Sequence, residues 1–204
     1  MSEANGNSLD SLVGLSGFRC IVADPPWTQR TGSPNLHIAG GGGASKFPPY
    51  ATMSVEEIAA LPVSDCAADG CHLYLWTTNR HLRSAYYVAE AWGFPARPGT
   101  LLVWCKSPKG RGLAESYSLA TEYCLFVQRG LKATKRVSRN WFEWPRGRHS
   151  AKPEAFQDMV ETVSPGPRLE LFARRKREGW TCWGNELDNQ PQQTILNLIP
   201  PSGG

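Results

Sequence analysis

The sequence predicts an α/β protein whose sheet is largely parallel and covered by helices on both faces. Short apolar runs of strand length alternate along the chain with segments that show helical periodicity or helix start and stop signals. Strands that alternate with helices assemble into parallel sheets, because each connecting helix packs back on the sheet. At 204 residues, with 41% hydrophobic and 20% charged residues, the chain is long enough to bury the core of one such domain.

We expect the folded domain to span residues 16–188, with a flexible polar lead-in over 1–15 and a tail rich in Gln and Pro over 189–204. An apolar patch in that tail, Ile195–Ile199, packs either on the body or on a second copy, so a homodimer is one option. No apolar run approaches the ~20 residues that span a bilayer, and the polar start lacks a signal-peptide core. Three of the six cysteines lie in apolar strand-like runs. We therefore expect a reduced, cytoplasmic protein that contacts no membrane.

The first predicted strand, Phe18–Ala23, ends on the segment Asp24-Pro25-Pro26-Trp27. Proline has no N–H for a sheet ladder and biases the preceding residue toward extended geometry, so the chain leaves the strand on a stiff tip. Open α/β sheets bind ligands at this carboxyl edge. Asp24 and the Pro25 carbonyl could each accept an N–H from an exocyclic amino group on a base. Trp27 would offer a ring for stacking, worth roughly 1–3 kcal/mol; the alternative is an ordinary turn with a surface Asp and a core Trp.

Local signals mark the elements that follow. Residues 28–49 form a long polar loop with a run of glycines, which we interpret as a lid over the substrate. Ser54 and Glu57 have the spacing of a capping box that opens a short helix. Asn79 is the predicted cap of a second helix that stops at Gly93. The further strands are expected over residues 72–77, 100–105, 122–128 and 168–173, followed by a short segment over 180–185.

Lys106 and Glu122 lie at the ends of two of these strands. They are either a surface ion pair, which would contribute little, or part of the lining of a substrate cleft, and the sequence leaves both open. A helix predicted over 153–163 begins with proline in its first turn. Its apolar residues have the i, i+3, i+4, i+7 spacing of a face that packs on a core: Phe156, Met159, Val160 and Val163.

Charge is uneven along the chain, although the net charge is only +4. Between Arg129 and Lys152 there are eight basic residues and one acid, a local charge of +7, which leaves −3 for the rest. Such runs are commonly solvated loops. Because Trp141 and Trp144 interleave with the charges, we instead favour contact with nucleic acid through residues 129–152.

Asp-Pro-Pro-Trp resembles the catalytic signature of the amino-methyltransferases that act on adenine N6 or cytosine N4. The order and spacing of further motifs resemble one branch, the MTA family of the METTL/Ime type. That family includes the catalytic subunit of the eukaryotic messenger-RNA adenosine methyltransferase, together with bacterial and phage homologues. The resemblance runs from about Gly17 to Leu187 and covers the segments 23–27 (ADPPW), 50–54 (YATMS), 73–77 (LYLWT), 103–106 (VWCK), 122–125 (EYCL), 149–153 (HSAKP), 169–174 (LELFAR) and 183–187 (WGNEL).

The resemblance implies a Rossmann-like class I methyltransferase fold with a permuted motif order, in which the catalytic strand comes first and the cofactor segment last. It implies S-adenosyl-L-methionine as cofactor, with neither a metal nor a covalent enzyme intermediate. The catalytic residues that it implies are Asp24, Pro25, Pro26 and Trp27. The substrate-binding residues that it implies are Tyr50, Trp76, Lys106 and Glu122. The cofactor-binding residues that it implies are Asp24, Lys152, Arg174, Asn185 and Glu186.

Several of these assignments have a structural alternative. The alternatives are a hydrophobic staple for Tyr50, a surface lysine for Lys152, a phosphate-facing arginine for Arg174 and a strand-end turn for Asn185. The chain also departs from the family pattern within its cofactor segment. Glu186 stands where many relatives have Gln, and Lys176-Arg177 follows Arg174 where eukaryotic members have a His-Asn pair.

The function that follows from the resemblance is transfer of a methyl group to the N6 amine of adenine in nucleic acid. We expect direct in-line transfer, with the amine held by Asp24 and the Pro25 carbonyl. DNA is favoured over RNA because the sequence shows no RNA-binding module beside the resemblance. Two alternatives stay open: an RNA adenosine N6-methyltransferase, and a non-catalytic nucleic-acid-binding subunit with the same fold.

Overall fold

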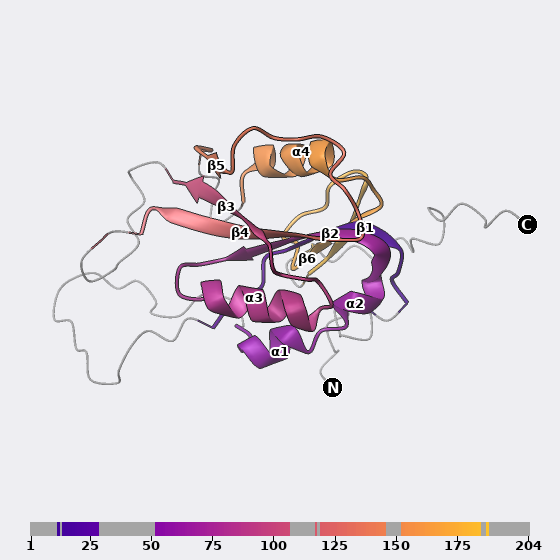
Figure 1. Ribbon diagram of the computed structural model, residues 1–204. Helices are drawn as coiled ribbons and strands as arrows, with labels where there is room; N and C mark the ends of the chain where they lie inside the picture. The colour runs from indigo at the N-terminus through magenta and orange to yellow at the C-terminus, as the bar shows by residue number, and fades with distance from the viewer. Residues whose placement is uncertain are drawn as a thin grey trace, which may run out of the picture.

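The computed structural model describes residues 12, 14–28, 52–106, 117, 119–145, 152–184 and 187, which build a seven-stranded sheet flanked by helices (Figure 1). The strands are β1 (Phe18–Ala23), β2 (Ala67–Thr77), β3 (Thr100–Cys105), β4 (Thr121–Arg129), β5 (Trp141–Phe142), β6 (Arg168–Leu171) and β7 (Trp180–Trp183). The helices are α1 (Val55–Ala59), α2 (Val63–Cys66), α3 (Leu82–Ala91) and α4 (Glu154–Val163). The strand order is β5-β3-β4-β2-β1-β6-β7, so β1 lies inside the sheet between β2 and β6.

The sheet is mostly parallel, as predicted. β1 runs parallel to β2 and to β6, β6 runs parallel to β7, and β3 runs parallel to β5. β4 is antiparallel to both of its neighbours, β2 and β3, and its reversed direction was not predicted. Because of that reversal, β4 begins at the edge of the sheet where β1, β2 and β3 end.

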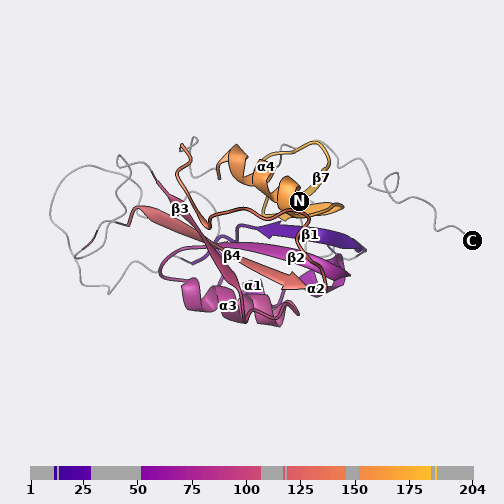
Figure 2. The ribbon, with the colours of Figure 1, turned by 45° about the horizontal axis from the view of Figure 1, so that its top comes forward.

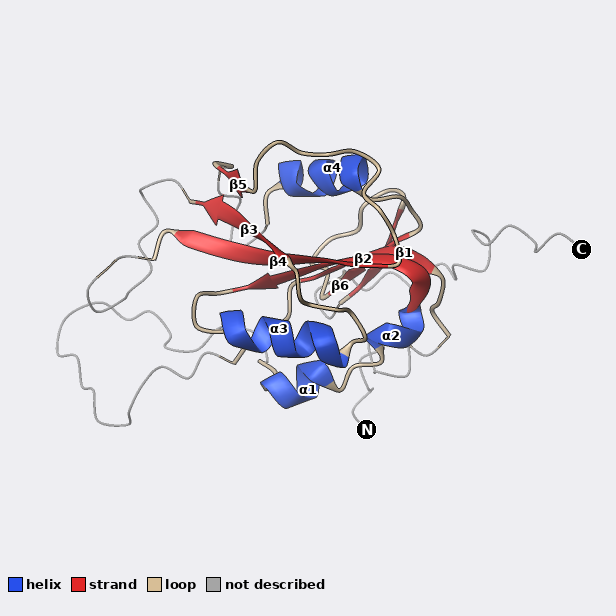
Figure 3. Cartoon of the chain, in the orientation of Figure 1, coloured by secondary structure: helices blue, strands red, loops and turns tan. Residues whose placement is uncertain are grey.

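Helices cover both faces of the sheet, as predicted (Figure 3). α1 and α3 lie together on one face, and α4 lies on the other, an arrangement that the turned view also shows (Figure 2). On the first face, the Trp92 indole N–H after α3 donates to the Ile58 carbonyl of α1 at 3.0 Å, which ties the two helices together. The seven-stranded sheet between these layers gives the protein the α/β architecture that its sequence indicated.

Burial on both faces explains why β1 is apolar from Cys20 to Ala23, after the exposed Arg19. Ile21 and Ala23 belong to the core under α1 and α3, whereas Cys20 and Val22 belong to the core under α4. A strand buried on both faces needs a continuous apolar run, and the run ends at Asp24, where the sheet meets its open edge.

Several local predictions are confirmed. Ser54 and Glu57 form the capping box: the Glu57 N–H donates to Ser54 Oγ at 3.1 Å, and the Ser54 N–H donates to Glu57 Oε2 at 2.7 Å. Gly93 ends α3 with a left-handed φ of 77°. All six cysteines are free thiols. Apart from these predictions, none of the helices among the described residues is long and apolar enough to cross a membrane.

Other local predictions were wrong in their boundaries. α3 begins at Leu82 after His81, and its N-terminus has no side-chain cap, so Asn79 is not the cap residue. β2 begins at Ala67, five residues before the predicted start, because its first part already pairs with β1 at Phe18. Leu12, which falls in the predicted lead-in, is only 2% exposed and belongs to the core under α1 and α3.

Candidate active site

The tip after β1 is fixed by backbone hydrogen bonds. The Trp27 N–H donates to the Pro25 carbonyl at 2.8 Å, which closes a tight turn. The Met53 N–H donates to the Pro26 carbonyl at 2.8 Å, and the Thr28 N–H donates back to the Met53 carbonyl at 3.1 Å. The two prolines have no N–H of their own, so the segment before α1 supplies the partner that a further strand would have supplied. A carbonyl oxygen has two lone pairs, and Pro25 therefore keeps one for a ligand.

Trp27 anchors the tip to β2 and to His81. Its indole N–H donates to the Trp76 carbonyl at 2.9 Å, and its ring stacks on His81 with centroids 5.3 Å apart and an interplanar angle of 15°. The His81 Nε2–H donates to the Thr28 carbonyl at 3.0 Å. Only 6% of Trp27 is exposed, so the ring is buried in this structure, and stacking of a base on it stays a prediction. The indole is a packing residue that holds the tip against β2.

Asp24 is one end of a row of alternating charges, here named the charged cluster: Asp24, Lys152, Glu122 and Lys106. Lys152 Nζ lies 2.7 Å from Asp24 Oδ2 and 3.3 Å from Glu122 Oε2, and Lys106 Nζ pairs with the other oxygen of Glu122. The four side chains are between 15% and 26% exposed. The charged cluster is therefore open to ligands but largely shielded from solvent, unlike an isolated surface ion pair.

Four elements bring the charged cluster together at one sheet edge. Asp24 follows the end of β1, Lys106 follows the end of β3, and Glu122 lies at the start of the reversed strand β4. Lys152 precedes α4 on the face above them. The reversal of β4 is thus what delivers an acid to an edge where the other strands end.

Two tryptophans form the floor under the cations. Lys152 Nζ lies 5.0 Å from the ring centroid of Trp76, and Lys106 Nζ lies 5.3 Å from that of Trp104. A cation at this distance over an indole is attracted by the negative face of the ring. Trp76 is only 2% exposed. Lys152 lies over the Trp76 ring, and a direct contact between Trp76 and substrate stays a prediction.

The charges of the cluster shift one another's titration. Burial alone would raise the pKa of Glu122, but Lys152 and Lys106 outweigh it and hold that pKa below its usual value. Burial alone would lower the pKa of Lys152, but Asp24 and Glu122 outweigh it and raise that pKa. Both directions favour the charged forms of Glu122 and Lys152.

Glu170 is a neighbouring acid that the sequence did not single out. It lies in β6 beside Val22 of β1, and Gln157 of α4 donates an N–H to it at 2.7 Å. Burial, and then the negative charge of Asp24, raise its pKa to about 7, against the pull of Arg175. Its signal in the sequence is an acid that stands between two leucines, Leu169 and Leu171, in a segment of strand length.

The predicted cofactor segment leaves the sheet next to the tip. β6 pairs with β1, and after it Phe172 adopts a left-handed φ of 61° before the Ala173 N–H donates to the Trp183 carbonyl at 2.9 Å. Arg174 follows this turn and is half-buried. A Cβ added to Gly184 would lie 2.2 Å from the Ala173 carbonyl oxygen, so the two chain segments approach as closely as glycine allows.

Arg177 belongs to the scaffold. Its guanidinium donates to Asp158 at 2.7 Å and to Glu161 at 2.8 Å, both on α4. At residues 176–177, where the chain departs from the family pattern, Arg177 thus forms ion pairs that attach the segment between β6 and β7 to α4. Tyr50, Asn185 and Glu186 lie outside the described residues, as do the predicted lid, most of the loop after β3 and the C-terminal tail.

Comparison with known proteins gives a consistent result. The MT-A70 family model matches residues 18–186. The type II methyltransferase M.MunI of Mycoplasma sp. is 31% identical over 190 residues, which cover 85% of this chain and 79% of that enzyme. The probable N(6)-adenosine-methyltransferase MT-A70-like of rice (Oryza sativa subsp. japonica) is 29% identical, covering 85% of this chain and 24% of its own length. The human N(6)-adenine-specific methyltransferase METTL4 is 28% identical, covering 83% of this chain and 37% of its own length.

Proposed function

Since the chain belongs to the MT-A70 family, we propose that it is an S-adenosyl-L-methionine-dependent methyltransferase that methylates the N6 amine of adenine in nucleic acid, with DNA favoured over RNA. The observation that carries the proposal is the position of Asp24. Its carboxylate lies at the carboxyl end of a central strand, paired with Lys152 at 2.7 Å, beside a proline tip with a carbonyl that can accept a further hydrogen bond. DNA is favoured because the relative of similar length is a type II methyltransferase.

The two carboxylate oxygens of Asp24 can have different partners. Lys152 donates to Oδ2, so Oδ1 is available to accept one N–H of the adenine amino group. The Pro25 carbonyl can accept the other N–H through its second lone pair. Two acceptors on one amino group fix its plane and increase electron density on nitrogen, which an exocyclic amine needs because its lone pair is delocalised into the ring.

The charged cluster also suits the charge that develops during transfer. The amine nitrogen becomes cationic as it gains a methyl group, and a carboxylate already in place stabilises that charge without rearrangement. Asp24 is then the acceptor closest to the proton that the nitrogen loses. Lys152 keeps the Asp24 carboxylate oriented, because it donates to Oδ2 while Glu122 holds the same ammonium from another side.

The residues present fit the methyl donor. An ammonium has three donors, and Lys152 uses two of them on Asp24 and Glu122, which leaves one for the carboxylate of the cofactor's methionine tail. Arg174 follows β6 at the same edge, and we propose Asn185 and Glu186 as partners for the ribose hydroxyls. The bound cofactor would supply an activated methyl group on its sulfonium, and this chain would position the acceptor amine against it.

The variant Asp24→Asn tests the proposal, with Asp65→Asn on the exposed surface of α2 as the matched control. We expect the loss of methyl transfer to DNA to be about 100-fold or more, because the variant loses an electrostatic group that touches the reacting amine. Tritiated methyl incorporation into DNA and RNA oligonucleotides, with mass spectrometry for N6-methyladenine, measures the loss and the preferred acceptor. Full activity in Asp24→Asn would overturn the mechanism.

A calorimetric titration with S-adenosyl-L-methionine separates the enzyme from a non-catalytic subunit. We expect the wild type to bind the cofactor, and Asp24→Asn to retain part of that binding through Lys152 and Arg174. A wild type that binds nucleic acid but neither binds the cofactor nor transfers methyl groups would instead establish the non-catalytic alternative.

A further inference from the structure

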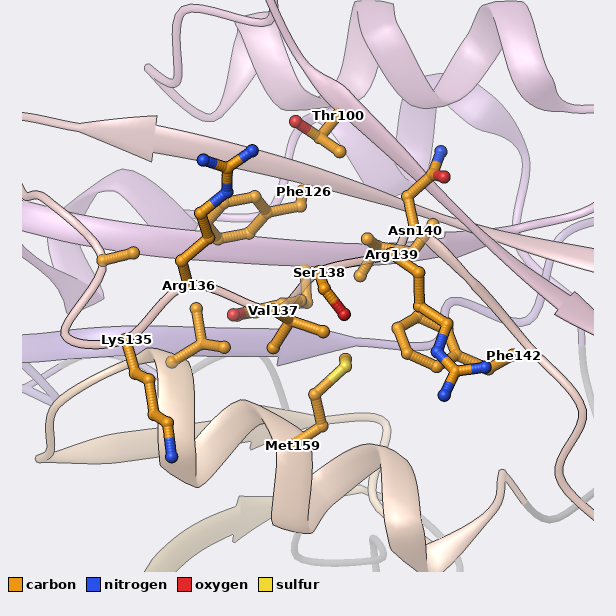
Figure 4. Close-up of a pocket in the computed structure, with 14 residues that line it drawn as sticks. Thr100, Phe126, Lys135, Arg136, Val137, Ser138, Arg139, Asn140, Phe142 and Met159 are labelled. Atoms are coloured by element: carbon orange, nitrogen blue, oxygen red, sulfur yellow. The ribbon is translucent and has the colours of Figure 1, made fainter.

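A cavity of about 400 Å³ lies on the α4 face of the sheet (Figure 4), and no residue of the charged cluster lines it. Its floor is apolar and comes from the sheet and from α4. Its outer wall is the segment that connects β4 to β5. The residues that the argument uses are Leu102 and Phe126 on the floor, Met159 on α4, and Lys135, Arg136 and Arg139 on the wall.

The cavity exists because α4 covers only part of this face. Phe156 of α4 packs on Trp76 and Tyr74 of β2, with ring centroids 4.7 and 5.8 Å apart. The part of this face that β3 and β4 form is covered by the irregular segment 131–140 and not by α4. Phe126 in the interior strand β4 therefore stays half-exposed, although its neighbours Leu125 and Val127 are buried.

The wall of the cavity is held in place by hydrogen bonds at both ends. The Thr134 N–H donates to the Val163 carbonyl at 2.8 Å. The Val103 N–H donates to the Asn140 carbonyl at 2.7 Å, and the Asn140 side chain donates to the Leu101 carbonyl at 3.0 Å. The cavity is therefore preformed, and its volume falls in the range of small-ligand sites.

The lining is strongly one-sided in charge. Three of its fourteen residues, Lys135, Arg136 and Arg139, are basic, and none is acidic. Next to them Trp141 is 48% exposed, with the Arg139 guanidinium 5.6 Å from its ring centroid. An apolar floor with a cationic rim and an exposed aromatic ring suits a ligand that is both planar and anionic, which describes a nucleotide.

The cavity opens on the same face as the charged cluster. Glu122 and Phe126 are four residues apart on β4 and point to the same face, a separation of about 13 Å at 3.3 Å per residue. Trp104 and Trp144 lie between the two sites, joined by a hydrogen bond from the Trp104 indole to the Trp144 carbonyl at 2.9 Å. One nucleic-acid strand can reach both sites without crossing the sheet.

The geometry points to a binding site for a nucleotide that flanks the target adenine on the same strand. Its base would lie on Phe126 and Met159, and successive phosphates of the same strand would meet the basic side chains spaced around the cavity, Lys135, Arg136 and Arg139. This inference rests on the proposed function, since it assumes that the target adenine lies at Asp24. It assigns the cavity a role in choosing which adenines are methylated, because the Ser138 and Asn140 side chains on its wall can bond to a base edge.

The test is an abasic scan. Short fluorescein-labelled single-stranded DNAs with one central adenine carry an abasic residue at one flanking position at a time, and anisotropy measures their dissociation constants. We expect one or two positions at which the wild type loses about fivefold or more in affinity, as for removal of one stacked base. In Met159→Trp, which fills the cavity, that position-specific loss should disappear. Thermal unfolding of the variant confirms that it is folded.

Charge variants provide a second readout. Lys135→Ala and Lys132→Ala remove the same charge from the same exposed segment, but only Lys135 lines the cavity. We expect Lys135→Ala to weaken binding of the intact DNA more than Lys132→Ala does. The loss of affinity caused by Lys135→Ala should be smaller for DNA that is abasic at the sensitive position. Equal effects of the two variants, or an abasic profile unchanged in Met159→Trp, would overturn the inference. Binding is measured without methyl transfer, so failure of the proposed function alone would leave this profile intact.

Discussion

Replacing Lys152 with Met tests the charged cluster most directly. The substitution keeps the stem that packs over Trp76 but removes the only cation that touches both Asp24 and Glu122 among the described residues. Exposed ion pairs contribute about 0–1 kcal/mol, whereas removing one partner of a buried pair costs about 3–5 kcal/mol. With side chains between 15% and 26% exposed, the cluster lies between these limits, and we expect a loss of about 2–3 kcal/mol at neutral pH.

The loss should depend on pH, and its sign follows from Glu122. In the wild type the pKa of Glu122 is held below its usual value, so Glu122 stabilises the fold above its unfolded pKa and loses that contribution as pH falls through its folded pKa. Without Lys152 the carboxylate loses a stabilising charge and its pKa rises. The difference in unfolding free energy between wild type and variant should therefore shrink as pH falls from neutral toward about 4.

Urea unfolding at several pH values measures this difference, with Lys132→Met as the control. Lys132 is exposed, and its replacement should change stability by no more than about 0.5 kcal/mol at any pH. A Lys152→Met protein as stable as the control, or one whose loss is the same at neutral and acid pH, would refute the view that the cluster is shielded and mutually stabilised.

Two further variants test the neighbouring segments. The Glu170 carboxyl, whose folded pKa is raised to about 7, stabilises the fold when it is protonated and loses that contribution as pH rises through about 7. Glu170→Gln should therefore be more stable than the wild type above pH 7, by up to about 3 kcal/mol, and this gain should vanish near pH 4. Denaturant unfolding across pH measures the difference. Gly184→Ala should lower the melting temperature by at least about 4 °C, because the added Cβ would lie 2.2 Å from a backbone oxygen. In the control Gly70→Ala the nearest contact of the Cβ is at 3.4 Å, so its free energy of unfolding should stay within about 1 kcal/mol of the wild-type value. Differential scanning calorimetry compares the two variants.

Features with a local cause were predicted from the sequence. The stiff tip at Asp24 follows from two prolines after an apolar run, and the capping box follows from the spacing of Ser54 and Glu57. The meeting of Asp24 with Lys152, 128 residues apart, was implied by the family resemblance and is confirmed by the 2.7 Å contact. Composition and periodicity alone would not have paired them.

Features decided by tertiary packing were not predicted. The direction of β4 leaves no trace in a short apolar run, because strands of either direction alternate in the same way. The first half of β2 contains Asp69-Gly70, which is typical of a turn, yet these residues lie inside β2, where the register with β1 shifts between Phe18 and Cys20. The burial of Trp27 depends on His81, which comes from a distant segment that no local rule connects to the tip.

The reversal of β4 has a consequence for how such an enzyme can diversify. β3 and β4 form an antiparallel pair whose connection leaves after Lys106 and returns before Glu122, and the Lys106 N–H donates to the Ala120 carbonyl at 2.7 Å where the connection closes. Both ends of this connection lie beside the charged cluster, so an insertion in it would begin and end there while every strand of the framework keeps its register. Lengthening one hairpin would thus change what lies next to Asp24 and Lys152 without altering the sheet that positions them.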